Sequence, residues 1–90
     1  MKVVFSQRAL EDYEYWKQND LPKVEKIKNL IAAIKQDPFK GVGRPEPLKH
    51  ELKGWWSRRI TREHRLVYRV SGKNPNQILD VSQCRFHYDD

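Results

Sequence analysis

The sequence predicts an α+β fold in which two N-terminal antiparallel helices pack on one face of a twisted antiparallel sheet of four or five strands. Three observations predict this class. Apolar residues within the first 36 positions recur at helical spacing in two segments that a short connection separates. Later the apolar period changes to two, which is typical of strands with one buried face. The runs of this second part alternate with turn residues, as in antiparallel hairpins. We expect one domain over residues 1–90.

The first predicted elements are a strand and a helix. The β-branched stretch Lys2–Phe5 predicts a strand, and Ser6 is a suitable N-cap for a helix over about Gln7–Gln18. The apolar side chains of this helix are Ala9, Leu10, Tyr13 and Trp16. Three of them recur at i, i+4 and i+7, so they would form one buried stripe.

A second helix follows the break "NDLP". Asp20 can cap this helix, and Pro22 fits its first turn. Its apolar stripe consists of Val24, Ile27, Leu30, Ile31 and Ile34. Pro38 ends the helix because the residue before a proline, here Asp37, is disfavoured in the helical conformation. The short connection implies that the two helices run antiparallel.

A long loop and then strands follow. The loop Asp37–Pro47, "DPFKGVGRPEP", holds three prolines and two glycines, and loops of this length are often functional. The period of two begins in "LKHELK", where Leu48, His50 and Leu52 alternate with charged residues. Strands are predicted at Trp55–Thr61, His64–Val70 and Ile78–Tyr88.

Alternation assigns the two faces of the predicted sheet. The side chains of the middle strand that should face the helices are Leu66, Tyr68 and Val70. The alternating positions of the same strand leave Arg65 and Arg69 on the open face. The last strand is ambiguous, because its apolar Leu79 and Val81 would share a face with polar Gln83 and His87. A bulge or twist near its end would resolve this conflict.

Composition narrows the class of protein. Hydrophobic residues make up 38% and charged residues 33% of the chain, which suits a small globular protein and not a disordered one. No apolar run approaches the roughly 18 residues that a membrane span needs, so we expect no membrane association. The single cysteine, Cys84, allows no internal disulfide, and we expect it to be buried. A reducing cytoplasm is the simplest location.

Positive charge is concentrated in the second half. The formal net charge is +6, and the segment Arg44–Arg69 alone carries eight basic and three acidic residues. Seven of the eight arginines lie at or after Arg44. Arginine suits phosphate because its planar fork forms bidentate hydrogen bonds. This distribution favours nucleic acid as a partner. The alternative is a basic surface that only maintains solubility.

One carboxylate stands in the stiffest part of this basic region. In "RPEPLKH", Glu46 lies between Pro45 and Pro47, each of which restricts its own φ angle and pushes the preceding residue towards extended backbone. A solvated glutamate, or one paired with Arg44 or Lys49, is one interpretation. The other is a general base whose position is set in advance.

Metal-free cleavage of RNA is the chemistry that these residue types support. It needs a base for the 2′-hydroxyl proton, an acid for the leaving 5′-oxygen and cations for the phosphorane oxygens. The residues that could supply them are Glu46, Lys49, Arg58, Arg59, Arg65 and His87. The acidic residues are too few and scattered for two-metal catalysis, so we expect no metal and no other cofactor. From the residues alone, the prediction ends at a nucleic-acid-binding domain, with ribonuclease activity left open.

One long motif resembles a known family. "GRPEPLKHELKGWWSRRITREHRLVYRV", followed by "CRFHY", is similar to the Txe/YoeB family of toxins from bacterial toxin–antitoxin modules, within the RelE superfamily. "DYEYWKQND" and "DPFKGVGRPEPLKH" fit the same family, so the resemblance spans essentially the whole chain. It implies a microbial RNase-like fold and an mRNA interferase that cuts mRNA in the ribosomal A site, leaving a 2′,3′-cyclic phosphate.

The resemblance also implies roles for individual residues. Glu46 matches the general base, His87 the general acid and Arg65 the arginine that stabilises the phosphate. Tyr88 matches the terminal tyrosine, which would orient the base or the leaving group. The residues that we expect to contact or border the RNA are Lys49, Arg58, Arg59 and Glu63. Among these, Arg58 is included for its place in the basic strand and not for a family role.

The implied partners are macromolecules: the 70S ribosome with its mRNA, a cognate antitoxin of the YefM/Phd type, and operator DNA bound only by the toxin–antitoxin complex. Family precedent favours a homodimer. Two other classes stay open, a non-catalytic ParE-type toxin that poisons DNA gyrase and a plain RNA-binding protein. Glu46 together with His87 argues against the ParE class, whose members generally lack that pair.

Overall fold

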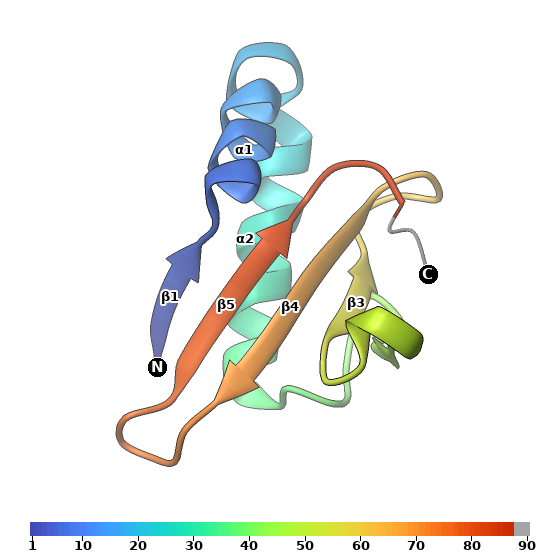
Figure 1. Ribbon diagram of the computed structural model, residues 1–90. Helices are drawn as coiled ribbons and strands as arrows, with labels where there is room; N and C mark the ends of the chain where they lie inside the picture. The colour runs from blue at the N-terminus through green and yellow to red at the C-terminus, as the bar shows by residue number, and fades with distance from the viewer. Residues whose placement is uncertain (88–90) are drawn as a thin grey trace.

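The computed structural model describes residues 1–87, in which two helices cover one face of a five-stranded sheet (Figure 1). The elements are β1 (Lys2–Phe5), α1 (Gln7–Asn19), α2 (Leu21–Gln36), β2 (Glu46–Pro47), the 3-10 turn η1 (His50–Leu52), β3 (Trp56–Arg59), β4 (Arg65–Ser71) and β5 (Ile78–Gln83). The predicted α+β class, with two helices on one sheet face, is confirmed. No helix of this part of the chain is long and apolar enough to cross a membrane.

The sheet has the strand order β1-β5-β4-β3-β2 and is antiparallel except at one edge. β2, β3, β4 and β5 pair antiparallel with their neighbours, whereas β1 runs parallel to β5. The expected antiparallel sheet therefore holds for four strands, and β1 is the exception. Strand propensity does not indicate whether a strand pairs parallel or antiparallel with its neighbour. The chain reverses direction at each step from β2 to β5, so that β5 runs parallel to β1.

Local signals set the ends of both helices. Ser6 Oγ accepts a hydrogen bond from Ala9 N at 3.0 Å, which satisfies a free amide in the first turn of α1. Asp20 separates the helices but does not cap α2 with its side chain; its carboxylate pairs with Lys23 Nζ at 2.6 Å. α2 ends one residue before Asp37, where the following proline predicts the end.

The core lies between the helices and the sheet. Its buried members are Ala9, Trp16, Val24, Ile27, Leu30, Ile34, Ile60, Leu66, Tyr68, Leu79, Val81 and Cys84. Two buried hydrogen bonds tie α1 to the chain beyond β5: Trp16 Nε1 donates to Cys84 O at 2.8 Å, and Cys84 N donates to Asp12 Oδ2 at 3.0 Å. Burial raises the pKa of the Cys84 thiol to about 12, so the predicted buried cysteine is confirmed and stays protonated.

A β-bulge resolves the ambiguous phase of the last strand. Tyr68 pairs with Val81, but its neighbour Val67 pairs with Gln83, so Ser82 is the extra residue in β5. Val81 therefore faces the core, and Gln83 faces the open side of the sheet. The expected bulge is present, but the strand ends at Gln83 and does not continue along the predicted range.

The alternating stretch after the proline loop does not form a strand. β2 covers only two residues, and His50–Leu52 form η1 instead. His50 has a φ of 56°, which an extended strand excludes. Leu48 N donates to Trp55 O at 2.9 Å, and this hydrogen bond joins the two ends of the segment that contains η1. A period of two over six residues does not by itself identify a strand.

Gly43→Ala is expected to destabilise the fold more than Gly54→Ala. Both glycines have positive φ, 87° and 96°, so alanine adds backbone strain of about 1–2 kcal/mol at either position. A Cβ on Gly43 would lie 2.8 Å from Leu30 Cδ2 and 3.1 Å from Arg58 Cβ, whereas a Cβ on Gly54 meets nothing within 4 Å. Overpacking should add about 1–3 kcal/mol at Gly43 alone. Urea unfolding measures both losses, and equal losses would contradict the steric account.

Candidate active site

The open face of the sheet, away from the helices, carries a row of paired residues across four strands. Glu46 of β2 pairs with Ser57 of β3, Ser57 with Val67 of β4, and Val67 with Gln83 of β5. Directly paired residues point to the same side, so all four share the open face. Val67 is only 1% exposed, and Ser57 and Gln83 are also buried. The middle of this face is therefore covered, and its ends remain accessible.

A pair of arginines lies on the same face, two residues further along. Arg59 at the end of β3 is paired with Arg65 at the start of β4. Because the pleat repeats every two residues, both lie on the side of Ser57 and Val67. The paired arginines and Glu46 therefore lie on the same face of the sheet, which confirms the open-face position predicted for Arg65.

Glu46 is held by backbone contacts on both sides. Arg59 N donates to Gly43 O at 2.7 Å before it, and Leu48 N donates to Trp55 O at 2.9 Å after it. The Glu46 side chain is exposed, and within residues 1–87 its carboxylate has no ion pair or hydrogen bond. The interpretation that Glu46 only neutralises Arg44 or Lys49 is thus not supported. A positioned carboxylate without a partner can accept a proton from a bound ligand.

The guanidinium of Arg65 is positioned by its own turn. Its Nη1 donates to the carbonyl oxygens of Thr61, Arg62 and His64 at 2.9, 3.0 and 3.2 Å. Thr61 Oγ1 in turn accepts hydrogen bonds from the backbone N–H of Glu63 and His64, both at 3.2 Å. The cation therefore sits in a rigid hairpin turn, and little of its freedom remains to be lost when it meets an anion.

The chain after β5 returns to the start of β4 (Figure 1). Arg65 N donates to Phe86 O at 3.0 Å. Gln83 Nε2, on the open face, donates to Arg85 O at 3.3 Å and to His87 O at 3.2 Å. These contacts hold the backbone of His87 beside the strand that carries Arg65. Tyr88, the remaining predicted catalytic residue, lies outside the described residues.

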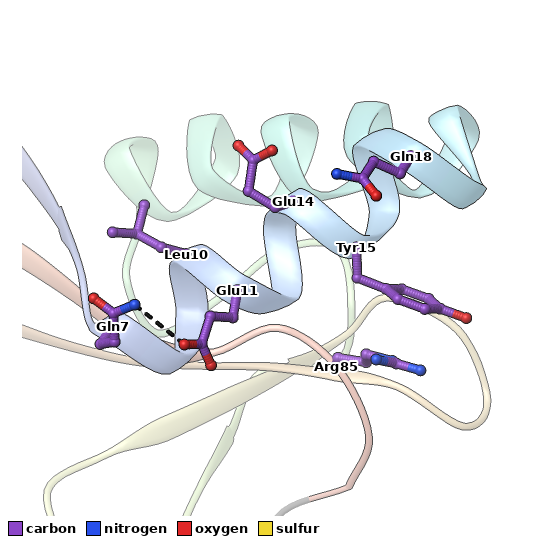
Figure 2. Close-up of a pocket in the computed structure, with 7 residues that line it drawn as sticks. All are labelled: Gln7, Leu10, Glu11, Glu14, Tyr15, Gln18 and Arg85. Carbon is purple, nitrogen blue, oxygen red and sulfur yellow. Dashed lines mark hydrogen bonds between the residues drawn. The ribbon is translucent and has the colours of Figure 1, made fainter.

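From the helix side, Arg85 anchors the same segment. Figure 2 shows its guanidinium stacked under the ring of Tyr15, at the floor of a pocket that α1 lines. Arg85 Cζ lies 3.3 Å from the Tyr15 ring centroid and 4.4 Å from that of Phe86. Cation–π contact of this kind stabilises a partly desolvated arginine. The acidic residues on the pocket wall, Glu11 and Glu14, belong to α1 and lie outside the open-face row.

The remaining predicted RNA-binding residues divide into two groups. Lys49, Arg59 and Glu63 are exposed, on the approach to η1, at the end of β3 and in the β3–β4 turn, respectively. All three are accessible to a ligand, and Arg59 shares the open face with Arg65.

Arg58 is the exception, and the prediction that it contacts RNA is wrong for this structure. It is 0% exposed and points towards the helices, opposite to Arg59. Nε donates to Tyr68 Oη at 3.1 Å, Nη1 to Val42 O at 3.0 Å, and Nη2 to the carbonyl oxygens of Asp37 and Lys40 at 2.7 and 2.9 Å. The alternation of β3 contained this signal, because two adjacent arginines on a strand cannot share a face.

Sequence reasoning also missed two residues that shape the site. Gln83 holds the segment of His87, and the bulge that brings Gln83 to the open face could be expected but not located. His64 precedes Arg65, and its Nδ1 accepts a hydrogen bond from Phe86 N in the same segment. A histidine next to the predicted phosphate-binding arginine was the available signal.

The fold of this chain also occurs in other solved structures. Solved structures of YafQ from Escherichia coli and of a toxin from Helicobacter pylori share it, with TM-scores of 0.73 and 0.76. They cover 94% and 97% of this chain, which covers 91% and 94% of theirs, at 18% and 17% identity. At such identities the likeness concerns the fold alone.

The family follows from closer relatives. The model of the family described as "YoeB-like toxin of bacterial type II toxin-antitoxin system" matches residues 5–88. Toxin YoeB of Escherichia coli (strain K12) is 49% identical over 98% of this chain and 100% of the relative. The chain belongs to the family of YoeB-like toxins of bacterial type II toxin–antitoxin systems.

Solved structures of relatives agree. The YoeB/ParE toxin from Agrobacterium tumefaciens is 56% identical, covers 98% of this chain and 100% of its own, and has a TM-score of 0.96. Two structures from Staphylococcus aureus, a YoeB dimer and a YoeB–YefM complex, are 42% and 40% identical, with TM-scores of 0.88 and 0.86. Each covers 98% of this chain and is 98% covered.

Proposed function

We propose that this toxin is a ribosome-dependent endoribonuclease that cleaves mRNA in the A site and so inhibits translation. The observation that carries the proposal is the open face itself. It presents the exposed carboxylate of Glu46, which has no partner among residues 1–87, and the arginine pair Arg59–Arg65, and its Gln83 binds the backbone carbonyl of His87. A base, phosphate-binding cations and an acid are the three components that metal-free RNA cleavage requires.

The proposed reaction is an internal transesterification. Glu46 takes the proton of the 2′-hydroxyl, and the resulting oxygen attacks the adjacent phosphorus. Arg65 stabilises the negative charge that develops on the phosphorane oxygens. His87, in its protonated form, gives its proton to the leaving 5′-oxygen, so the products carry a 2′,3′-cyclic phosphate and a 5′-hydroxyl. Tyr88 would orient the base or the leaving group. The step needs no metal or other cofactor.

The exposed residues around the site fit the remaining roles. Lys49 and Arg59 would bind the RNA backbone, because both are exposed cations, Arg59 on the open face and Lys49 three residues after Glu46. Glu63 lies in the turn that Arg65 organises, at the border of the same surface.

Partners are proposed from the relatives. The Staphylococcus aureus structures contain YoeB as a dimer and YoeB with YefM. For this chain we propose a YefM/Phd-type antitoxin, a homodimer, and binding to operator DNA only as the toxin–antitoxin complex. The 70S ribosome and its mRNA are the proposed targets, which places the active toxin in the cytoplasm.

A reconstituted translation reaction tests the proposal. The full chain is added, and the 5′ ends of the mRNA are mapped by primer extension with and without ribosomes. Cleavage within A-site codons only when ribosomes are present supports the proposal. Intact mRNA together with inhibited DNA gyrase would support a ParE-type toxin, and RNA binding without new ends would support a plain binding protein; either result would refute it.

Arg65→Ala is expected to lower the cleavage rate by about 10²- to 10³-fold, because a fixed cation at the phosphorane is lost. The free energy of unfolding should fall by about 1 kcal/mol, since the hydrogen bonds from Arg65 to the carbonyl oxygens of Thr61 and Arg62 lie within one partly exposed turn. Arg69→Ala is the matched control, because Arg69 is an exposed arginine on the same strand and face, four residues away, and forms an ion pair with Asp80 at 3.5 Å. A circular dichroism spectrum without native structure for Arg65→Ala would make Arg65 a folding residue instead.

A further inference from the structure

His64 links the core to the chain segment that carries His87. Its ring lies edge-to-face against Trp16 of α1, with centroids 4.8 Å apart and an interplanar angle of 79°. Its Nδ1 accepts a hydrogen bond from Phe86 N at 2.8 Å. An imidazole that accepts at Nδ1 is neutral and carries its proton on Nε2.

The residue that His64 binds has an unusual backbone. Phe86 has a φ of 66°, a left-handed conformation that non-glycine residues rarely adopt without support. Its N–H is bound by His64 and its carbonyl oxygen by Arg65 N, so both polar groups of this residue are satisfied by consecutive residues at the start of β4. The next residue is His87. The direction in which the chain presents His87 therefore depends on the Phe86 conformation.

We propose that His64 is a positioning residue of the nuclease: by accepting the Phe86 N–H at Nδ1, the neutral imidazole holds the left-handed turn that places His87 over the open face. Its catalytic consequence rests on the proposed function. His64 does not touch the reacting atoms in this scheme, and acts through the backbone of its neighbour.

The same hydrogen bond makes the segment sensitive to acid. A proton added to Nδ1 turns the acceptor into a donor that faces the Phe86 N–H, so the hydrogen bond is lost. Burial lowers the pKa of His64 from its ordinary value of 6.5. The charged groups around the ring are Glu63, which favours its protonation, and Lys23, Arg85 and His87, which oppose it. Arg62 lines the same pocket as His64 and Lys23, and Lys23 is itself paired with Asp20.

The sign of the pH dependence follows. The folded chain holds the His64 proton more weakly than the unfolded chain does. The stabilisation by the hydrogen bond from Phe86 N to His64 Nδ1 is therefore complete above the ordinary pKa of 6.5. It is lost as the pH falls through the lowered pKa of the folded state.

Hydrogen exchange at the Phe86 amide of the full chain tests the hydrogen bond to His64 without reference to activity. In the wild type, the protection factor should fall by about tenfold on acidification from about pH 7.5 to about pH 5. His64→Asn places a non-titrating oxygen where Nδ1 lies, so its protection should persist and change by less than about threefold over that range. His64→Leu should lose the protection at every pH. Wild-type protection that does not respond to pH would overturn the proposal, whether or not the variants fold.

The cleavage assay gives the second readout. His64→Leu should lower kcat by roughly three- to tenfold with KM for programmed ribosomes unchanged, and His64→Asn should restore it. The ratio of the His64→Asn rate to the wild-type rate should rise as the pH falls, because Glu46 and His87 are common to both proteins. A flat ratio overturns the positioning role. Absence of cleavage in the wild type would instead refute the proposed function. The exchange experiment would still decide whether His64 holds the Phe86 turn.

Discussion

Glu46→Gln is expected to lower the rate of mRNA cleavage by about 10²- to 10⁴-fold while the free energy of unfolding stays nearly unchanged. The amide keeps the shape of the side chain but cannot take the 2′-hydroxyl proton. Stability should hold because Glu46 is exposed and, in the part of the chain described by the structure, its carboxylate has no partner to lose. Single-turnover cleavage on programmed ribosomes measures the rate, and urea unfolding measures the stability.

His87→Gln should lower the cleavage rate by a similar factor, because the proton for the leaving 5′-oxygen is lost. The variant with both changes should lose no more activation free energy than the two single variants lose together. Glu51→Gln is the matched control for Glu46→Gln, since Glu51 is an exposed carboxylate on η1, only five residues away. If Glu46→Gln and Glu51→Gln lower the rate equally, the effect is one of surface charge, and Glu46 is not the base.

Arg58→Met is expected to lower the free energy of unfolding by about 3–5 kcal/mol, a large part of the stability of a domain of this size. Methionine fills much of the volume but binds none of the carbonyl oxygens of Asp37, Lys40 and Val42. Tyr68 would keep its bond to Pro38 O, at 2.6 Å, but would lose the Arg58 donor. Buried acceptors without donors are the physical reason for the loss.

Arg59→Met is the control for this change, because Arg59 is the exposed neighbour on the opposite face. We expect its free energy of unfolding to change by less than about 0.5 kcal/mol and its ribosome affinity to fall. Urea unfolding and a binding assay at two salt concentrations separate the two arginines. Normal stability with weakened RNA binding for Arg58→Met would reverse the assignment made from burial.

The structural role of Arg58 also bears on the site. The loop that it secures runs from Asp37 to Val42 and leads directly into β2, where Glu46 lies. A buried arginine thus orders the base of the loop, and the flanking prolines restrict its end. Partial loss of cleavage in a weaker variant such as Arg58→Lys would report this connection.

Much of the fold could be predicted from short-range patterns. The stripe from Val24 to Ile34, the cap at Ser6 and the break before Pro38 predicted both helices, because helix ends and faces depend on neighbours within four residues. The family motif identified the candidate residues Glu46, Arg65 and His87. The alternation of apolar and charged residues at 48–53 did not indicate a strand correctly, since the positive φ of His50 reflects a tertiary turn and not a local preference.

The sequence by itself determined the class of fold, the two helices, the distribution of charge along the chain and the types of side chain available to the site. Only the tertiary structure decided which arginine is buried, where the bulge falls and which groups hold His87. Arg58 and Arg59 are chemically identical, and only their pairing with Leu66 and Arg65 separates them. Likewise, Phe86 meets His64 across 22 positions of sequence. Such contacts depend on register and on chain return, which are set by packing of the whole sheet and not by any local pattern.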